Sequence, residues 1–364
     1  MNPADNRLID PYNAVGLIPN FQPISGRADI AVNIDHLEHL AAGAFWLSNL
    51  DIPVRLLAIP EGALQGFTDE IRDADHAEYA ATCAIDIPGP ETDRLGEMAR
   101  RWNVFVMGQA KARHPEWKDL FFNVGFVIAP SGEIVLQHYK LNALLPVERS
   151  VSPHDLFDWW VERYGRTLDA FWPVADTEIG RLGVMMAMEG NFPENGRGLA
   201  MNGAEVVYRA SLPAAFTEND VFEISNRARA LENNFYVVAP NIGGSIENGA
   251  PPIDAGGGRS MIVDYKGGIV GKQFDTNGST FVAGTVNIQA LRHHRASAQV
   301  TNWLKDVRTE LAEIIYERPM YPKNRYLHRI PGNHAEFRRE VIERQIELLT
   351  ERDIWRPPYQ NPTA

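Results

Sequence analysis

The sequence is poor in cysteine, and this scarcity limits the kinds of protein it can encode. Among 364 residues there is a single cysteine, Cys83. One thiol cannot form an internal disulfide and cannot supply a cysteine-rich metal cluster. The ten histidines show neither an HExxH pattern nor a Cys/His ligand spacing. We therefore expect a protein of the reducing cytoplasm that holds no metal ion, with Cys83 as a buried structural thiol.

Long apolar runs and an excess of positive charge are also missing. No stretch approaches the ~18 apolar residues that a membrane helix needs. The first residues, MNPADNRLIDPYNAVG, lack the basic and then apolar segments of an export signal. Because 35 Lys and Arg stand against 47 Asp and Glu, the net charge is −12, which repels phosphate backbones. We expect a protein that binds neither membranes nor nucleic acids and is not exported.

Strand-like and helix-like segments alternate along the chain, and this alternation predicts an α/β fold. Proline ends an apolar strand at VRLLAIP, and an amphipathic helix follows the turn PGP. Turn residues at PSG and KGG predict two hairpins. The segments are a strand at 54–60, a helix at 91–102, hairpins at 121–140 and 260–272, and a strand at 181–188 that leads through a turn into a helix ending at Asn202-Gly203.

The composition changes after about residue 290. The segment RHHRASAQVTNWLKDVRTELAEIIYERP is rich in Arg and His, with His293-His294 as a predicted surface pair. A last amphipathic helix follows, with Asn333 and Glu336 as its predicted cap. We therefore divide the chain into a domain at 1–290 and an extension at 291–364. The apolar stripe of that helix must cover the body of its own chain or a neighbouring subunit.

Three positions share one description: Glu61, Lys140 and Ala187 each lie at or just past the C-terminal end of a predicted strand. A charged residue that closes a strand is most often simply solvated. In α/β sheets, however, the strand ends converge on one edge, where ligands bind. The combination therefore predicts a functional site rather than three unrelated surface positions.

The stretches around these positions match known motifs. PEGALQGF at 60–67, YKLNALLPVE at 139–148 and MAMEGNFPENGRGLAMNGAEVV at 186–207 resemble, in the same order, the three signature blocks of the nitrilase (carbon–nitrogen hydrolase) superfamily, especially its amidase and formamidase branches. With the intervening strands, the resemblance covers most of residues 10–285. It implies a four-layer α-β-β-α sandwich, here with a C-terminal extension, and an enzyme that needs no cofactor.

The resemblance also assigns roles to individual residues. It makes Glu61 the general base, Lys140 the cation beside the developing oxyanion, and Glu148 a second carboxylate that orients the site. The nucleophilic cysteine is expected two residues before Glu189, and that position is Ala187. Cys83 lies outside all three blocks and is a poor substitute.

The residues after Ala187 are expected to contact the reacting group. Met188, Glu189 and Asn191 are the predicted oxyanion and substrate-binding residues, with the backbone N–H of Met188 as one donor to the oxyanion. The activity implied is hydrolysis of a non-peptide C–N bond, from an amide to an acid and ammonia or an amine. With a methyl group at position 187 no acyl-enzyme can form, so the chain is expected to be inactive or strongly impaired by this route.

Two explanations of Ala187 remain open. In the first, a cysteine was replaced to inactivate an otherwise complete site. In the second, the gene encodes alanine, and the protein either binds a ligand without turnover or uses Glu61 to activate water for attack on the substrate. The retained charges of Glu61, Lys140 and Glu148 favour a site still in use, because buried charges are costly to keep. If a nucleophile is restored, N-carbamoyl-amino-acid and nitrile hydrolysis are alternatives to amide hydrolysis.

The segment at 149–180 is long and aromatic. Trp159, Trp160, Tyr164, Phe171 and Trp172 either wall a substrate pocket or pack into the body or a subunit interface. By resemblance, a connection of this length puts a substrate as small as formamide in doubt. The resemblance also implies a homodimer or a higher homo-oligomer, with a small amide-type molecule as substrate.

Overall fold

The computed structural model describes residues 7–143, 147–211, 220–245, 258–273 and 280–358. Two six-stranded sheets form its centre. In the first sheet, β1 pairs in parallel with β3, and β3 with β4, while the outer strands are antiparallel. Its strands, in spatial order, are β14 (Thr280–Val286), β1 (Tyr12–Ile18), β3 (Val54–Ala58), β4 (Phe105–His114), β5 (Trp117–Ile128) and β6 (Ile134–Tyr139).

The second sheet repeats this plan. Its central strands β8, β9 and β10 are parallel, and antiparallel strands flank them. The spatial order is β13 (Ile269–Lys272), β12 (Met261–Val263), β10 (Tyr236–Ala239), β9 (Val206–Tyr208), β8 (Gly180–Val184) and β7 (Val174–Thr177). A short parallel pair joins β2 (Asn20–Phe21) to β11 (Gly244–Ser245).

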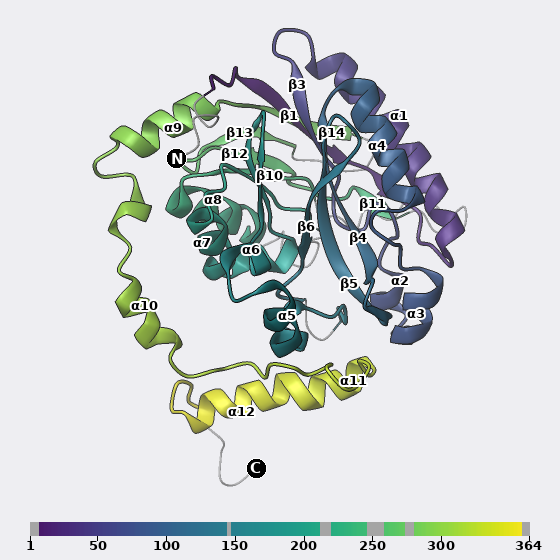
Figure 1. The fold of residues 1–364 in the computed structure, drawn as a ribbon, viewed down its shortest axis with the longest axis vertical. Helices are drawn as coiled ribbons and strands as arrows, with labels where there is room; N and C mark the ends of the chain where they lie inside the picture. The colour runs from purple at the N-terminus through teal and green to yellow at the C-terminus, as the bar shows by residue number, and fades with distance from the viewer. Residues whose placement is uncertain (1–6, 144–146, 212–219, 246–257, 274–279, 359–364) are drawn as a thin grey trace.

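Helices cover the outer face of each sheet (Figure 1). On the first sheet lie α1 (Ile30–Ser48), α3 (His76–Thr82) and α4 (Pro90–Trp102), near the short α2 (Thr68–Ile71). On the second lie α7 (Pro193–Met201) and α8 (Val221–Asn233). The short helices η2 (Arg27–Asp29), η3 (Pro153–Leu156), α5 (Phe157–Tyr164), α6 (Leu168–Phe171) and η4 (Ala187–Asn191) complete this part of the chain.

Three hydrophobic cores separate the four layers. The middle core joins the inner faces of the two sheets, for example Leu56 and Met107 of the first with Leu182 of the second. One outer core packs the first sheet against α1 and α4, and the other packs the second sheet against α7 and α8. The predicted α-β-β-α sandwich is therefore confirmed, and most of the sheet strands are buried on both faces.

Most of the predicted elements are present. The helix expected at 91–102 is α4, which starts with Pro90 at its first position and ends at Asn103 with a φ of 53°. The hairpin expected at 121–140 is β5 and β6, with Gly132 at a φ of 87° in its turn. Strand β5 begins earlier than predicted, at Trp117. The residues that follow, Lys118 and Asp119, are exposed and polar, so this part of the strand has no apolar pattern in the sequence.

The predicted boundary at residue 290 falls inside a helix. Helix α9 (Ile288–Ser297) is continuous through that position, and its Ile288 and Leu291 are buried in the core between the sheets. His294 is also buried, with its ring 5.1 Å from that of Tyr265, so the prediction of a surface pair at His293-His294 was wrong for His294. The body of the domain therefore extends to the end of α9.

An extended arm follows α9 (Figure 1). It contains η6 (Trp303–Asp306), α10 (Thr309–Tyr316), α11 (His334–Phe337), a π-helical segment (Arg338–Glu343) and α12 (Arg344–Glu351). The predicted cap is present, since Asn333 Oδ1 accepts the backbone N–H of Glu336 at 2.9 Å. The predicted apolar stripe consists of Phe337, Val341, Ile342, Ile346 and Leu349. Phe337 and Val341 are buried against the body of the chain, whereas Ile346 is exposed.

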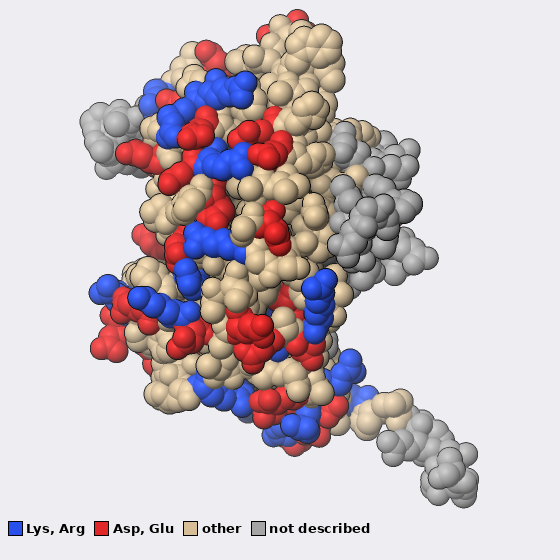
Figure 2. All heavy atoms as spheres, turned by 90° about the vertical axis from the view of Figure 1, so that its right-hand side faces the viewer, with Lys and Arg blue, Asp and Glu red and all other residues tan. Residues whose placement is uncertain are grey.

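The face of the molecule that carries α1 and α4 presents both signs of charge. Figure 2 shows Lys and Arg interspersed with Asp and Glu over this face. Several of them are paired, including Arg94 with Asp35 at 2.6 Å and Arg113 with Asp86 at 2.7 Å. Among the described residues, no helix is long and apolar enough to cross a membrane.

Candidate active site

Lys140 lies at the centre of a buried cluster of charges. It follows the last residue of β6, and its Nζ donates to Glu61 Oε1 at 2.9 Å and to Glu148 Oε2 at 2.7 Å. All three side chains are at most 5% exposed. The structure thus brings together the three charged residues that the sequence selected as catalytic, Glu61 from one segment of the chain and Lys140 and Glu148 from another.

Asn123 holds the two carboxylates from the other side. Its Nδ2 donates to Glu61 Oε1 at 2.9 Å and to Glu148 Oε1 at 2.8 Å. Gln109 Nε2 donates to Asn123 Oδ1 at 2.6 Å, which fixes the orientation of the amide. Gln109 Oε1 in turn accepts the N–H of Gly62, directly after Glu61. Strand pairing produces this arrangement, because Asn123 of β5 lies opposite Lys111 of β4 and therefore diagonal to Gln109, two residues earlier on β4.

Burial and charge act in opposite directions on this cluster. Burial alone would raise the pKa of Glu148, but the ammonium groups of Lys140 and Lys111 hold that pKa well below its ordinary value. Burial alone would lower the pKa of Lys140, but Glu148 and Glu61 keep it above its ordinary value. Lys140 and Glu148 therefore remain an ion pair throughout the neutral pH range.

The turn at Ala187 has a special backbone conformation. Ala187 has a φ of 40°, in the left-handed region, which costs a non-glycine residue about 1 kcal/mol. Its N–H donates to Ala210 O at 2.7 Å, and its carbonyl accepts from Arg209 Nη2 at 3.0 Å. A sharp turn between β8 and α7, held through its own backbone, presents the side chain of residue 187 whatever that side chain is.

Arg209 is the buried cation of this turn. Besides the carbonyl of Ala187, its guanidinium donates to Ser225 Oγ at 2.7 Å and to Asn226 Oδ1 at 2.8 Å. Burial and repulsion from Arg229 lower the pKa of Arg209 to about 9, while the negative charge of Glu61 opposes this shift. The turn is thus fastened to α8 by a fully hydrogen-bonded cation.

Glu189 ties the turn to the lysine segment. Its Oε1 accepts the N–H of Leu141 at 2.7 Å, and its Oε2 accepts the N–H of Met186 at 2.7 Å. His138 Nε2 lies 3.0 Å from both oxygens. Because Glu189 is completely buried and its oxygens are occupied by these groups, its carboxylate supports the turn rather than facing a ligand.

The other two residues predicted to contact substrate lie beside the turn. Met188 is partly buried, and its sulfur accepts a hydrogen bond from Asn191 Nδ2 at 3.4 Å. Asn191 Oδ1 accepts from Arg209 Nη2 at 3.1 Å. The amide of Asn191 is therefore held between the Met188 sulfur and the guanidinium that fixes Ala187.

Cys83 lies apart from this cluster. It follows α3, is 5% exposed and belongs to the core beneath α1 and α4. Burial raises the pKa of its thiol, which keeps it protonated and weakly nucleophilic. Among the described residues, no group of three or more His, Cys, Asp and Glu side chains could hold a metal ion.

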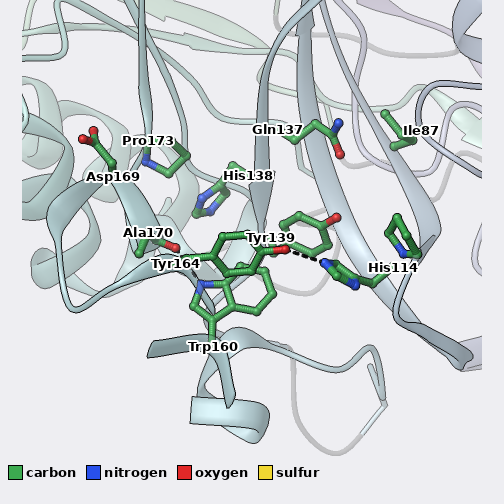
Figure 3. A pocket seen from close by; sticks show the side chains of 11 residues that line it. Ile87, His114, Gln137, His138, Tyr139, Trp160, Tyr164, Asp169, Ala170 and Pro173 are labelled. Carbon is green, nitrogen blue, oxygen red and sulfur yellow. Dashed lines mark hydrogen bonds between the residues drawn. The ribbon is translucent and has the colours of Figure 1, made fainter. Parts of the chain in front are cut away.

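A pocket opens beside β6, lined in part by His138, the residue that contacts Glu189. It has a volume of about 450 Å³ and is lined by His114, Tyr139, Trp160 and Tyr164 among others (Figure 3). The hydroxyl of Tyr164 lies 2.7 Å from His114 Nε2. Of the aromatic segment, Trp160 and Tyr164 line this pocket, whereas Trp172 packs against α7, with its Nε1 donating to Asn195 at 3.0 Å. That the pocket takes a substrate stays a prediction.

Comparisons with known proteins identify the family of the chain. The model of the carbon-nitrogen hydrolase family matches residues 18–296. A formamidase from Bacillus thuringiensis (strain Al Hakam) is 29% identical over 192 residues, which are 52% of this chain and 51% of the relative. The match therefore spans about half the length of that curated relative.

Solved structures share the fold. Nit3 of Saccharomyces cerevisiae, a member of branch 10 of the nitrilase superfamily, superposes with a TM-score of 0.59 at 19% identity, over 81% of this chain and 96% of Nit3. An amidase from Nesterenkonia sp. AN1 superposes with a TM-score of 0.59 at 19% identity, over 83% of this chain and 96% of the amidase. The chain belongs to the carbon–nitrogen hydrolase family.

Proposed function

We propose that this protein carries an amide-hydrolysing site of the Glu–Lys–Cys type in which Ala187 occupies the position of the nucleophile. The observation that carries the proposal is the pair of hydrogen bonds from Lys140 to Glu61 and Glu148, made in a buried cluster. The bond from Leu141 to Glu189 connects that cluster to the left-handed turn at Ala187. Acyl transfer requires a base, a cation near the oxyanion and a turn that presents a nucleophile.

The first half of the reaction forms an acyl-enzyme when position 187 carries a thiol. Glu61 takes the thiol proton, and the sulfur attacks the amide carbon. The carbonyl oxygen becomes an oxyanion, which Lys140 and the backbone N–H of Met188 stabilise. Glu61 then gives its proton to the departing amine, so the C–N bond breaks and ammonia or an amine leaves.

The second half returns the enzyme to its starting state. Glu61 removes a proton from water, the hydroxide attacks the thioester, and the acid leaves as the sulfur recovers the proton. Glu148 keeps Lys140 charged and in place throughout both halves. In a glutamate-to-glutamine mutant of the Nesterenkonia amidase, the acetamide moiety of fluoroacetamide is added covalently at the active-site cysteine, which supports a nucleophilic sulfur in an amidase of this fold.

The methyl group of Ala187 removes the nucleophile from this scheme. Loss of such a residue lowers kcat by on the order of a million-fold in an enzyme that depends on it. We therefore propose that the alanine form binds an amide without turning it over, and that Ala187→Cys restores hydrolysis. Ala187 itself also favours a second candidate, a protein that uses the same pocket only to bind a ligand.

The experiment is a measurement of ammonia release by Ala187→Cys and by the unaltered chain, side by side. The substrates are short amides, aromatic amides, nitriles and N-carbamoyl amino acids, which separate the alternatives for the acyl group and the bond. Lys140→Met in the Ala187→Cys background is the matched control, because it keeps the thiol and removes the cation.

Each outcome decides between the candidates. Turnover by Ala187→Cys alone supports the proposal, and the best substrate names the acyl group. Turnover by the alanine form shows that Glu61 activates water directly. Saturable amide binding with no turnover by either form favours the ligand-binding protein and contradicts amide hydrolysis.

We also propose that the protein works in the cytoplasm as a homodimer or a higher homo-oligomer. Helix α10 exposes Leu311, Ile314 and Ile315, each more than 60% exposed, on the arm that leaves the body. An apolar face of this kind favours association with another copy of the chain. Sedimentation equilibrium of the unaltered chain tests this, and a monomer at micromolar concentration would contradict it.

A further inference from the structure

A second lysine lies buried on the same sheet as the catalytic cluster. Lys111 is on β4 and is 1% exposed. Gln65, from the segment that follows Glu61, fixes its backbone: Gln65 Oε1 accepts the N–H of Lys111 at 2.6 Å, and Gln65 Nε2 donates to its carbonyl at 3.0 Å. The position of this lysine is therefore set by the same segment that carries the general base.

The ammonium group of Lys111 faces three carboxylates. Its Nζ donates to Glu70 Oε1 at 2.9 Å and lies 3.6 Å from Asp69 Oδ2. It also lies 3.6 Å from Oε1 of Glu148, whereas Lys140 binds the other oxygen of that carboxylate. Glu148 is thus placed between two lysines, one for each oxygen.

The cluster as a whole contains more carboxylates than cations. Among the described residues, its members Glu61, Asp69, Glu70 and Glu148 lie with Lys111 and Lys140, and all of these side chains are 13% exposed or less. Counting Arg209, whose charge Glu61 attracts from the turn at Ala187, four carboxylates stand against three cations. Uncompensated charge in such a site is strongly unfavourable. A proton bound to one of the carboxylates would reduce the imbalance.

The neighbouring cations do not supply the missing charge. Arg149 points to Asp73, at 3.1 Å. His76 Nε2 accepts the N–H of Phe121 at 3.2 Å, so that nitrogen carries no proton. Burial, with Arg149 and Lys111 nearby, lowers the pKa of His76 to about 3, which leaves the ring neutral. The groups that act on Asp69 and Glu70 are Lys111, Glu148, Glu61, Tyr79 and Cys83 in addition to each other.

The titration of the two acids agrees with a bound proton. Burial raises the pKa of Glu70 to about 8, against the attraction of Lys111. Burial also raises the pKa of Asp69, again opposed by Lys111. Burial alone would lower the pKa of Lys111, but Asp69 and Glu70 keep it well above its ordinary value. The extra proton therefore lies on Asp69 or Glu70, and Lys111 keeps its positive charge.

We propose that Lys111 is a positioning residue for the hydrolytic site, which holds Glu148 by its charge from the side of Oε1, the oxygen that Asn123 and Ser150 also bind, and that Asp69 and Glu70 share one proton at neutral pH. The effect of Lys111 on hydrolysis rests on the proposed function, whereas the proton shared by Asp69 and Glu70 does not. Lys111 makes none of the contacts expected of a group that touches the reacting atoms, so it acts through Glu148. Its positive charge helps to hold the pKa of Glu148 well below its ordinary value and so keeps that carboxylate ionised.

The first test is the pH profile of kcat/KM for Lys111→Met in the Ala187→Cys background. Removal of the cation raises the pKa of the carboxylates it faces, so the acid limb moves to higher pH by on the order of one unit. Lys118→Met, at an exposed position of β5, is the matched control and should leave the profile unchanged. An equal loss of activity at every pH, with the limb in place, contradicts the positioning role.

The second test needs no activity and uses the unaltered chain. Infrared spectra at pH 7 are compared with those of Glu70→Gln, and the difference should contain the C=O band of one protonated carboxyl group. No such band in the difference contradicts the shared proton, even where Lys111→Met does not fold. If Ala187→Cys hydrolyses no substrate, the proposed function fails, while this spectrum still decides whether the acids hold a proton.

Discussion

The backbone N–H of Leu141 donates to the carboxylate of Glu189 across 2.7 Å, and this bond joins the end of β6 to the turn that carries Ala187. Leu141 directly follows Lys140, and Glu189 lies two residues after Ala187. The bond therefore links the segment that follows Lys140 to the segment that follows Ala187, although β6 and β8 belong to different sheets. The N–H of Met186 binds the same carboxylate, so Glu189 links the lysine segment to the turn through two hydrogen bonds.

Glu189→Gln should weaken this hydrogen-bonded link between the lysine segment and the turn. An amide offers one acceptor oxygen, so one of the two N–H groups that it now binds would face an NH₂ group. Loss of a hydrogen bond to a charged group costs about 1.5–3 kcal/mol, and the thermal unfolding midpoint should fall accordingly. Glu97→Gln, at an exposed position of α4, is the control and should leave the midpoint unchanged. Equal midpoints for the two variants would show that Glu189 carries no such load.

Asn123→Asp should disable the site with almost no change in shape. The new carboxylate would face Glu61 and Glu148 at the positions where Asn123 now donates, and like charges at such distances repel. In the Ala187→Cys background we expect roughly a hundredfold loss of kcat at neutral pH, with partial recovery in acid as the new group is protonated. Asn103→Asp, at the exposed end of α4, should retain full activity. Full activity of Asn123→Asp would contradict its proposed place in the cluster.

Gly190→Ala should disturb the turn through Arg209. A Cβ atom at Gly190 would lie 2.1 Å from Arg209 Nε, and Ser225 and Asn226 hold that guanidinium in place. Such overpacking costs about 1–3 kcal/mol. At Gly43 of α1 a Cβ atom meets nothing within 4 Å, so Gly43→Ala should be neutral or stabilising. Chemical denaturation of both variants checks this, and equal stability would show that the turn yields without strain.

The stability of the fold should decrease as the pH rises through the neutral range. Burial raises the pKa of Glu70 from 4.5 to about 8, so between these values the folded chain keeps a proton that the unfolded chain has released. The free energy of unfolding therefore falls with increasing pH across this window. Glu70→Gln has no proton to lose and should show a flatter dependence in urea denaturation at several pH values. A steeper dependence for Glu70→Gln would contradict the raised pKa.

The sequence identifies the site residues that lie at strand ends. Glu61, Lys140 and Ala187 each follow an apolar run, and Glu148 lies in the same block as Lys140. These positions can be read locally, because a polar residue that ends a buried strand is visible in the order of residues alone. Their assembly into one cluster, and the sandwich that produces it, follow from the family blocks.

The groups that support the cluster were not predicted. Gln109, Lys111 and Asn123 lie within strands, and their meeting depends on the pairing of β4 with β5, where Lys111 is opposite Asn123. Register cannot be read from two separate runs of residues. The polar Asn123 within the apolar stretch FFNVGF was the one visible signal, since a buried amide requires partners.

The most direct test of the central claim, that position 187 is the nucleophile position of an amide-hydrolysing site, is the intact mass of Ala187→Cys after brief mixing with an amide substrate and an acid quench. We predict a mass increase equal to the acyl group, located by proteolysis on the peptide that contains residue 187, and no increase for the unaltered chain. An acyl group found on Cys83, or turnover without any acylated protein, would contradict the account.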